Sequence, residues 1–172
     1  MLPIVKKEAS MTYKRLGSIA VLFILLTFPA SASMVSFLLV ETGINEDVPN
    51  RPYSSIWEGG LMAAFFDAGF IVTNSPIARM ERRPEKDFSG PLEEDFREAV
   101  EGGAEYFILG FLDFQAQDGR IVPVEITIKV YDSASIKLIC EQGFPVGKGR
   151  NLDDEYKLAQ SAGWILISHL SE

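Results

Sequence analysis

The sequence has a single cysteine, Cys140, and a single histidine, His169. One cysteine excludes an intramolecular disulfide, even in a compartment that would allow one. A zinc site needs several Cys or His ligands at short spacing, and a catalytic histidine needs a nucleophile beside it. We therefore expect Cys140 to be a small buried residue of a strand, and His169 to be a surface residue at the end of the last helix.

The hydrophobic run near the start is too short to cross a membrane. It comprises the 13 residues Leu16–Phe28, which as a helix span about 20 Å against about 30 Å of hydrocarbon. Basic residues precede the run and Ala30-Ser31-Ala32 follows it, an arrangement typical of a secretory signal peptide. The basic residues are Lys6, Lys7, Lys14 and Arg15. We predict that residues 1–32 are a cleaved signal peptide, with either Met1 or Met11 as the initiator.

An uncleaved anchor is the alternative, because the stretch of low charge continues to Val40. That interpretation places Pro29 and three serines inside the bilayer and takes residues that a strand requires. No cysteine follows the run, so no thiol is available there for lipid attachment. The cleaved form predicts a periplasmic or secreted protein with no stable membrane insertion.

Basic residues are few, 16 Lys and Arg against 24 Asp and Glu, for a net charge of −8. The predicted leader takes four basic residues and one acidic residue, so the remaining 12 basic and 23 acidic residues give −11. Such an acidic chain is a poor partner for nucleic acid or anionic lipid. Residues 33–172 number 140, the size of one domain that buries about 68% of its unfolded surface.

The apolar patterns predict a single α/β (α+β) domain with one mixed sheet, in the order β-α-β-α-β-β-β-α. Val122–Asp132 alternates apolar and polar residues, which indicates a sheet covered by helices on one side. Asp118-Gly119 suits the turn of a hairpin. We expect helices packed on this sheet, at residues 55–68, 91–101 and after Asn151, and strands at residues 34–40, 70–73, 105–114, 122–132 and 136–141.

The ends of the helices carry recognisable signals. Ser55 and Glu58 fit a capping box at the start of the first helix. Gly59 and Gly60 weaken that helix, so we expect a close neighbour that needs the space. The last helix is expected to begin after Asn151 and to bury one face against the core. The residues of that face are Leu152, Tyr156, Ala159, Gly163, Leu166 and Leu170.

Two sequence features resemble sites for chemistry. Gly143–Arg150 (GFPVGKGR) is similar to a phosphate-binding loop, but it is one residue short and has Gly149 where a magnesium-binding hydroxyl belongs. We interpret it as tight turns. Asp113 near the end of an apolar strand is either an acid with a perturbed pKa or a residue that caps a turn, and the second interpretation is favoured.

The segment RMERRPEKDF concentrates cations on an otherwise acidic protein. Arg79, Arg82 and Arg83 stand beside Met80 and Phe88, a composition found in protein interfaces. The three arginines are therefore candidate partner contacts. The alternative is a solvated loop whose charges cancel against Glu81, Glu85 and Asp87.

Three segments carry a family pattern: FFDAGFIVTN, REAVEGGAEYFILGFLDF and VEITIKVYDSASIKLI. The pattern resembles the exported domains of CsgG-like and LpoB-like envelope lipoproteins and the amino-terminal domain of TolB. Gly69-Phe70-Ile71-Val72, Gly103-Ala104-Glu105-Tyr106, Gly110 and Asp132-Ser133-Ala134-Ser135 occupy the matching places. The lipid-bearing cysteine of the lipoproteins and the Thr-Gly of their last turn are absent. The resemblance implies this fold and a non-enzymatic envelope module that contacts other proteins.

These observations predict an exported, non-enzymatic bacterial envelope protein that serves as an accessory module of an envelope assembly. The partners are envelope proteins of unknown identity, and the oligomeric state stays open. We predict no catalytic residue, no metal site and no cofactor. The alternative is a small-molecule or enzymatic site in a pocket near Asp113, using Glu125 or Tyr131.

The predicted leader is tested by the mass of the mature protein. We expect the protein recovered from its native host to begin at Ser33, because small residues at Ala30 and Ala32 suit cleavage after Ala32. Intact-mass and N-terminal peptide analysis measure this. Recovery of peptides that contain Leu16–Phe28 in the mature protein would contradict the prediction.

Overall fold

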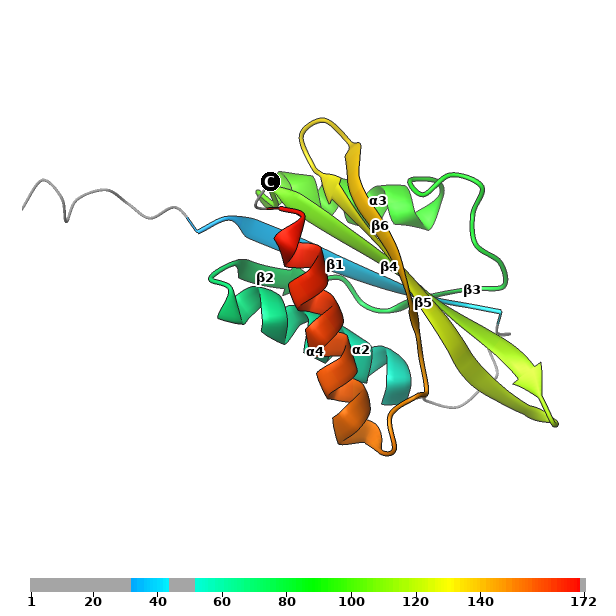
Figure 1. The fold of residues 1–172 in the computed structure, drawn as a ribbon. Coiled ribbons are helices and arrows are strands. Elements are labelled where there is room, and N and C mark those ends of the chain that lie inside the picture. The colour runs from blue at the N-terminus through cyan, green and yellow to red at the C-terminus, as the bar shows by residue number, and fades with distance from the viewer. Residues whose placement is uncertain (1–31, 44–51, 171–172) are drawn as a thin grey trace, which may run out of the picture. The chain divides into compact units, whose positions relative to one another are not determined.

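The computed structural model of the protein describes residues 32–43 and 52–170. These residues belong to one unit, Ala32–Glu172, and residues 1–31 of the predicted signal peptide lie outside them. Figure 1 shows a single mixed sheet with helices packed against it. The elements in chain order are β1 (Met34–Thr42), α2 (Pro52–Asp67), β2 (Ile71–Asn74), β3 (Ala78–Met80), α3 (Pro91–Glu101), β4 (Tyr106–Gln117), β5 (Arg120–Asp132), β6 (Lys137–Pro145) and α4 (Leu152–Ser168).

The predicted fold class is confirmed, and one short strand is added to it. The strands lie in the order β2-β1-β4-β5-β6, with β1 parallel to β4 and the last three strands antiparallel. β3 extends the β2 edge by pairing with Val40–Thr42 of β1, beyond the part of β1 that pairs with β2. The segment that contains β3 was expected to be irregular. Three residues are too few to show a strand period, and β1 supplies the pairing.

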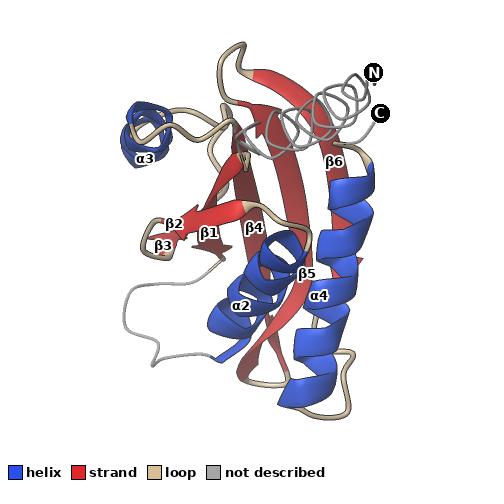
Figure 2. Cartoon of the chain, turned by 90° about the vertical axis from the view of Figure 1, so that its left-hand side faces the viewer, coloured by secondary structure: helices blue, strands red, loops and turns tan. Residues whose placement is uncertain are grey.

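The sheet has a packed core on each face (Figure 2). Helices α2 and α4 cover one face, toward which Val35, Phe37 and Leu39 of β1 point. Helix α3 covers part of the other face, where Leu38 and Val40 are buried. The alternation of residues 122–132 indicated helices on one side of the sheet, and the structure adds α3 on the other side. Tyr131 lies on the α3 face and is only 6% exposed.

The β4–β5 hairpin and the N-terminal cap of α4 agree with the sequence prediction, whereas the predicted N-terminal cap of α2 does not. Asp118 and Gly119 both have positive φ, 51° and 73°, as the type I′ turn between β4 and β5 requires. The Asn151 side chain accepts from the Asp154 amide at the start of α4. Helix α2 begins at Pro52 instead of after Ser55. Proline favours the first helical position, so the helix starts one turn earlier than the capping box indicated.

The buried side of α4 differs in part from the predicted one. Ala159, Gly163 and Leu166 are buried as expected, but Leu152 and Tyr156 are 46% and 38% exposed. Cys140 is half-buried on β6, and its burial raises the pKa of the thiol above its ordinary value. The thiol is therefore predominantly protonated at neutral pH, and its expected character as an unreactive strand residue holds.

Helices α2 and α4 meet through glycine. A Cβ placed on Gly60 would lie 2.6 Å from the Ala159 Cβ and 2.7 Å from the Tyr156 carbonyl oxygen. A Cβ on Gly163 would lie 2.6 Å from the Ala64 Cβ. The expectation that Gly60 makes room for a neighbour is confirmed. Gly59 has only ordinary contact with the ring of Tyr156, at 3.6 Å.

Alanine substitutions at the two adjacent glycines test this contact. Gly60→Ala must push the helices apart, and we expect it to lower the free energy of unfolding by about 1–3 kcal/mol. Gly59→Ala adds helix propensity without a clash and should raise that free energy by up to about 1 kcal/mol. Urea unfolding of the two variants measures both values. Equal effects of the two substitutions would contradict the close approach of the helices.

Candidate functional site

Arg79 is joined to a buried carboxylate of its own chain. Its Nε lies 2.8 Å from Oε2 of Glu41 at the end of β1, and Glu41 is only 3% exposed. The other carboxylate oxygen of Glu41 accepts a hydrogen bond from Ser54 of α2. This cluster connects β3, β1 and α2. Arg79 is thus held in an internal ion pair.

Arg83 is also held by an internal carboxylate, that of Asp113. The guanidinium donates from Nε to Oδ1 at 3.1 Å and from Nη2 to Oδ2 at 2.5 Å. It also donates to Thr127 at 2.9 Å, and its central carbon lies 5.2 Å from the centre of the Phe111 ring. Thr42 donates to Oδ1 of the same carboxylate. Asp113 therefore bridges β1, β4 and the loop, instead of capping a turn.

The rest of the segment is fastened to the sheet as well. Asp87 accepts from Lys129 Nζ at 2.8 and 3.0 Å and from the Tyr131 hydroxyl. Burial, together with the hydrogen bond to Asp87, raises the pKa of Tyr131 above its ordinary value, so the phenol remains a donor. The ring of Phe88 lies 4.3 Å from that of Phe96. The alternative of a purely solvated loop was therefore wrong.

Of the three candidate arginines, Arg82 alone is directed away from such pairs. It is exposed and makes no hydrogen bond or ion pair with the part of the chain that the structure describes. Arg79 and Arg83 are thus engaged in separate ion pairs. Partner contact by these arginines stays a prediction, and it rests chiefly on Arg82.

The loop that resembles a phosphate-binding loop surrounds a carboxylate of the protein itself. Glu155 in the first turn of α4 is 1% exposed. One of its oxygens accepts from the Trp57 indole and the Gly147 amide, each at 2.8 Å, and the other accepts from the Gly149 amide at 2.9 Å. Three donors compensate the buried charge, and they fix the β6–α4 loop and α2 to the start of α4.

Glu155 is one of three acids in the first turn of α4, where the helix dipole favours negative charge. The helical period gave a further signal, because Glu155 lies in line with the buried Ala159, Ala162 and Leu166. A carboxylate on the apolar stripe of a helix must find hydrogen-bond donors when it is buried. Of its partners, Trp57 lies 98 residues away along the chain, whereas the two loop amides lie only 8 and 6 residues before it.

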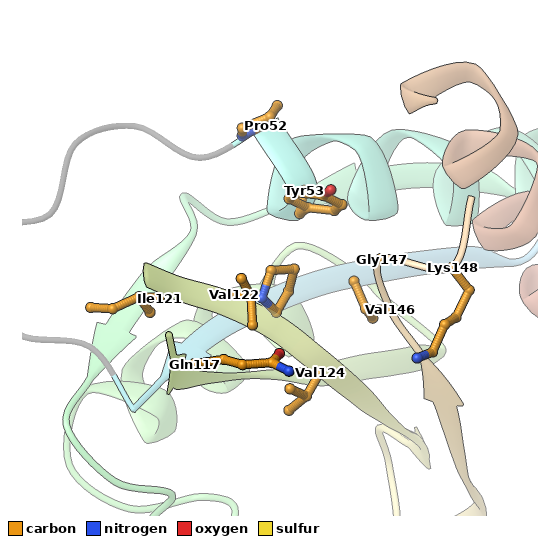
Figure 3. Close-up of a pocket in the computed structure, with 10 residues that line it drawn as sticks. Pro52, Tyr53, Gln117, Ile121, Val122, Val124, Val146, Gly147 and Lys148 are labelled. Carbon is orange, nitrogen blue, oxygen red and sulfur yellow. The ribbon is translucent and has the colours of Figure 1, made fainter. Parts of the chain in front are cut away.

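A hollow of about 420 Å³ lies between the start of α2, the β4–β5 hairpin and the β6–α4 loop (Figure 3). Val122, Val124 and Val146 contribute to its lining, but the exposed surface of its walls is more polar than apolar. Tyr53 and Lys148 are the titratable residues of its lining. Asp113, Glu125 and Tyr131, named for the alternative function, do not line it. The hollow is therefore not the pocket near Asp113 that the alternative function requires.

Among the described residues, the outer side of α4 carries the largest group of exposed apolar side chains found on any one element. Leu158, Trp164 and Ile165 are 41%, 46% and 47% exposed. Leu158 and Ile165 stand two turns apart on the same side of the helix. Ser161 and Ser168 donate to carbonyl oxygens of their own helix, Lys157 and Ile165, at 2.8 and 2.6 Å. We call the surface of Leu158, Ser161, Trp164, Ile165 and Ser168 the α4 face.

A family model described as an uncharacterised protein matches residues 37–143. The chain belongs to this family. The match spans β1 to most of β6 and ends before α4, so it covers the sheet and the carboxylate clusters at Glu41 and Asp113. No curated protein matches the sequence.

Solved structures with partial similarity include three from bacteria. The PelC dodecamer of Paraburkholderia phytofirmans is 15% identical, with 81% of this chain and 87% of that chain covered and a TM-score of 0.45. The LpoB C-terminal domain of Salmonella enterica is 12% identical, with 73% and 91% covered and a TM-score of 0.40. TolB of Acinetobacter baumannii is 12% identical, with 83% and 28% covered and a TM-score of 0.38. LpoB and TolB were expected from the sequence, whereas the CsgG-like similarity stays a prediction. All three TM-scores are below 0.5, so we transfer no function from them.

The Glu155 cluster can be tested by an isosteric change. In Glu155→Gln the side-chain amide nitrogen replaces one carboxylate oxygen. It must then face at least one of the N–H groups that donate to the carboxylate in the native protein. We expect the free energy of unfolding to fall by about 1–3 kcal/mol, the usual loss for an unsatisfied buried group.

The matched control is Asp153→Asn, an exposed acid in the same first turn. It should cost less than about 1 kcal/mol, since only the helix dipole is affected. Urea unfolding at neutral pH compares the two variants. A loss for Glu155→Gln no larger than that of the control would show that the buried cluster does not stabilise the fold.

Proposed function

We propose that the protein is an exported, non-enzymatic module of the bacterial envelope that works by binding another protein through the α4 face. The predicted signal peptide supports export to the periplasm or beyond. Arg79, Arg83, Asp87 and Asp113 are engaged in internal pairs, which supports a structural role for them. No helix in residues 32–43 and 52–170 has the length and apolar character needed to cross a membrane.

The observation that carries the proposal is the absence of charge along an exposed helix side. From Leu158 to Leu170 the sequence has no Asp, Glu, Lys or Arg, although the whole chain carries a net charge of −8. Burying this side in an interface would therefore require no charge to leave water. The two serines already have partners within the helix, so their hydroxyl groups cost little to cover.

The composition of the face also suits a protein partner. Tryptophan is among the residues that contribute most to binding energy when they enter a pocket of the partner. Leu158 and Ile165 extend the apolar surface beside Trp164 over two helical turns. Helix α2 and the Glu155 cluster hold α4 in place, so binding would cost little conformational entropy. We expect a partner with an uncharged, apolar surface, and an envelope protein is the kind that an exported chain would meet.

The alternative, a small-molecule or enzymatic site near Asp113, has less support. Both carboxylate oxygens of Asp113 are bonded to Arg83, and one of them also accepts from Thr42. Tyr131 is bonded to Asp87, and Glu125 lies over Gly143, where a Cβ would meet its oxygen. Asp113 and Tyr131 therefore have separate structural partners.

Site-specific photocrosslinking in the native host tests the α4 face. A photoreactive amino acid replaces Ile165 in one variant and Ile71 of β2 in the other. Both isoleucines are 47% exposed, so the pair is matched in residue type and accessibility. We expect a discrete adduct with one envelope protein from position 165 and none from position 71. Adding Trp164→Glu to the position-165 variant should abolish the adduct, because it introduces a charge into the apolar contact.

Circular dichroism must show that each variant is folded, and fractionation must place it outside the cytoplasm. The same adducts from both positions, or no adduct from position 165, would overturn the proposal. Recovery of the protein in the cytoplasm would overturn the export part alone.

A further inference from the structure

Strand β6 forms an open edge of the sheet, next to α4 (Figure 2). The Val146 amide donates to the Val124 carbonyl at 3.1 Å, so the even-numbered residues from 140 to 146 direct their backbone groups toward β5. Glu141, Gly143 and Pro145 consequently direct theirs outward. No part of the chain that the structure describes pairs with these outward groups.

The open part of this edge is short. A β-bulge in the β5–β6 ladder leaves Ile139 without an opposite residue, and Pro145 has no N–H to donate. Both features limit the growth of a sheet beyond its edge strand. Between them, Glu141 and Gly143 are exposed, and each offers one N–H and one C=O. The edge therefore fits one short extended segment.

The side of α4 that carries Leu158 and Ile165 adjoins this edge. Helix α4 contacts α2 through Gly163 and also contacts β6, whereas α2 contacts β1 and β2. At about 100° per residue, Leu158 and Ile165 lie about 140–160° around the helix from Gly163, on the side away from α2. They are about 10 Å apart along the axis, the length of about three residues of a strand. A segment paired with β6 would therefore place side chains against both.

The two faces of β6 differ in charge. Phe144 belongs to the apolar layer of α2 and α4. On the other face Glu141 and Glu125 are exposed. Lys129 lies 3.9 Å from Glu141, but it is already paired with Asp87 at 2.8 Å. Opposite charges on neighbouring strands stabilise a sheet, so an added strand is favoured by apolar residues that face α4 and basic residues that face Glu141.

We propose that β6 receives a strand from the partner, an extended segment of alternating apolar and basic residues that pairs antiparallel to residues 140–145. Its apolar side chains contact Leu158 and Ile165, and its basic side chains lie opposite Glu141. In recognition of this type, main-chain hydrogen bonds give affinity and alternate side chains give specificity. The inference rests on the proposed contact through the α4 face and specifies the form of the partner.

The test uses the synthetic peptide acetyl-Lys-Val-Lys-Val-Lys-Val-Lys-amide as a probe. It is added to nitrogen-15-labelled protein purified after expression of the full chain, and amide hydrogen exchange is followed by NMR. We expect the exchange of the Glu141 and Gly143 amides to slow at least about tenfold, because the probe covers these groups. The amide of Gln142, already directed toward β5, should change little.

Two N-methylated forms of the probe, equal in charge, test the geometry of pairing. In an antiparallel pair, the residue opposite Glu141 lies on the same face and exchanges both hydrogen bonds with it. The lysine amides of the probe therefore donate to β6, and the valine amides point away. Methylation of the lysine amides should abolish the protection, whereas methylation of the valine amides should preserve it. Equal effects of the two forms, or the reverse order, would overturn the inference.

Protein variants test the side-chain contacts through the affinity of the probe, measured by NMR titration. Glu141→Lys places like charges opposite each other and should weaken binding about three- to fivefold. Leu158→Ala combined with Ile165→Ala should weaken it by about the same factor, since apolar area is lost from the contact. The control is Phe66→Ala on α2, where the side chain is 67% exposed, and it should leave the affinity unchanged.

Unchanged exchange at Glu141 and Gly143 with millimolar probe would overturn the inference. So would protection that appears without the probe and rises with protein concentration, because a second copy would then occupy the edge. An adduct from position 165 in the native host, without protection by the probe, would overturn the strand addition alone. Protection by the probe without that adduct would overturn the envelope contact alone.

Discussion

Strand β1 is the constraint on which the rest of the structure depends. Its residues Val35–Thr42 are all buried, so every backbone N–H and C=O of the strand must find a partner inside the protein. β4 provides pairing along one edge, and β2 and then β3 provide it along the other. The alternating side chains enter both cores. Packing on both faces and pairing on both edges are therefore decided by nine residues.

The polar end of β1 determines how the following segments are arranged. Glu41 and Thr42 stand where the strand leaves the two cores, and each joins a different group of partners. Through Glu41 the strand holds Arg79 and the start of α2. Through Thr42 and Asp113 it holds Arg83 and the loop that leads to α3. A buried carboxylate is stable only when donors surround it, so these pairs fix the course of a chain segment that lacks a core of its own.

The two faces of the sheet consequently differ in character. Helices α2 and α4 make a close apolar layer, fixed by the contact at Gly60 and Gly163 and by the carboxylate of Glu155. The opposite face is covered by one shorter helix and a loop, and the turn between β5 and β6 holds Ile136 at a φ of +55°.

The sequence alone predicted the class of the fold, the order of its elements, the hairpin at Asp118-Gly119 and the cap at Asn151. These features depend on residues near one another in the chain, through strand and helix periods and the φ preferences of turn residues. It did not reveal β3, the early start of α2 or the partners of Arg79, Arg83, Asp87 and Glu155. Those partners lie 6 to 98 residues away along the chain. A charged residue looks the same in sequence whether it is solvated or paired, and only the tertiary structure brings the second charge beside it. The exposure of Trp164 and Ile165 was decided in the same way, because the helical period marks an apolar side chain but not whether another element covers it.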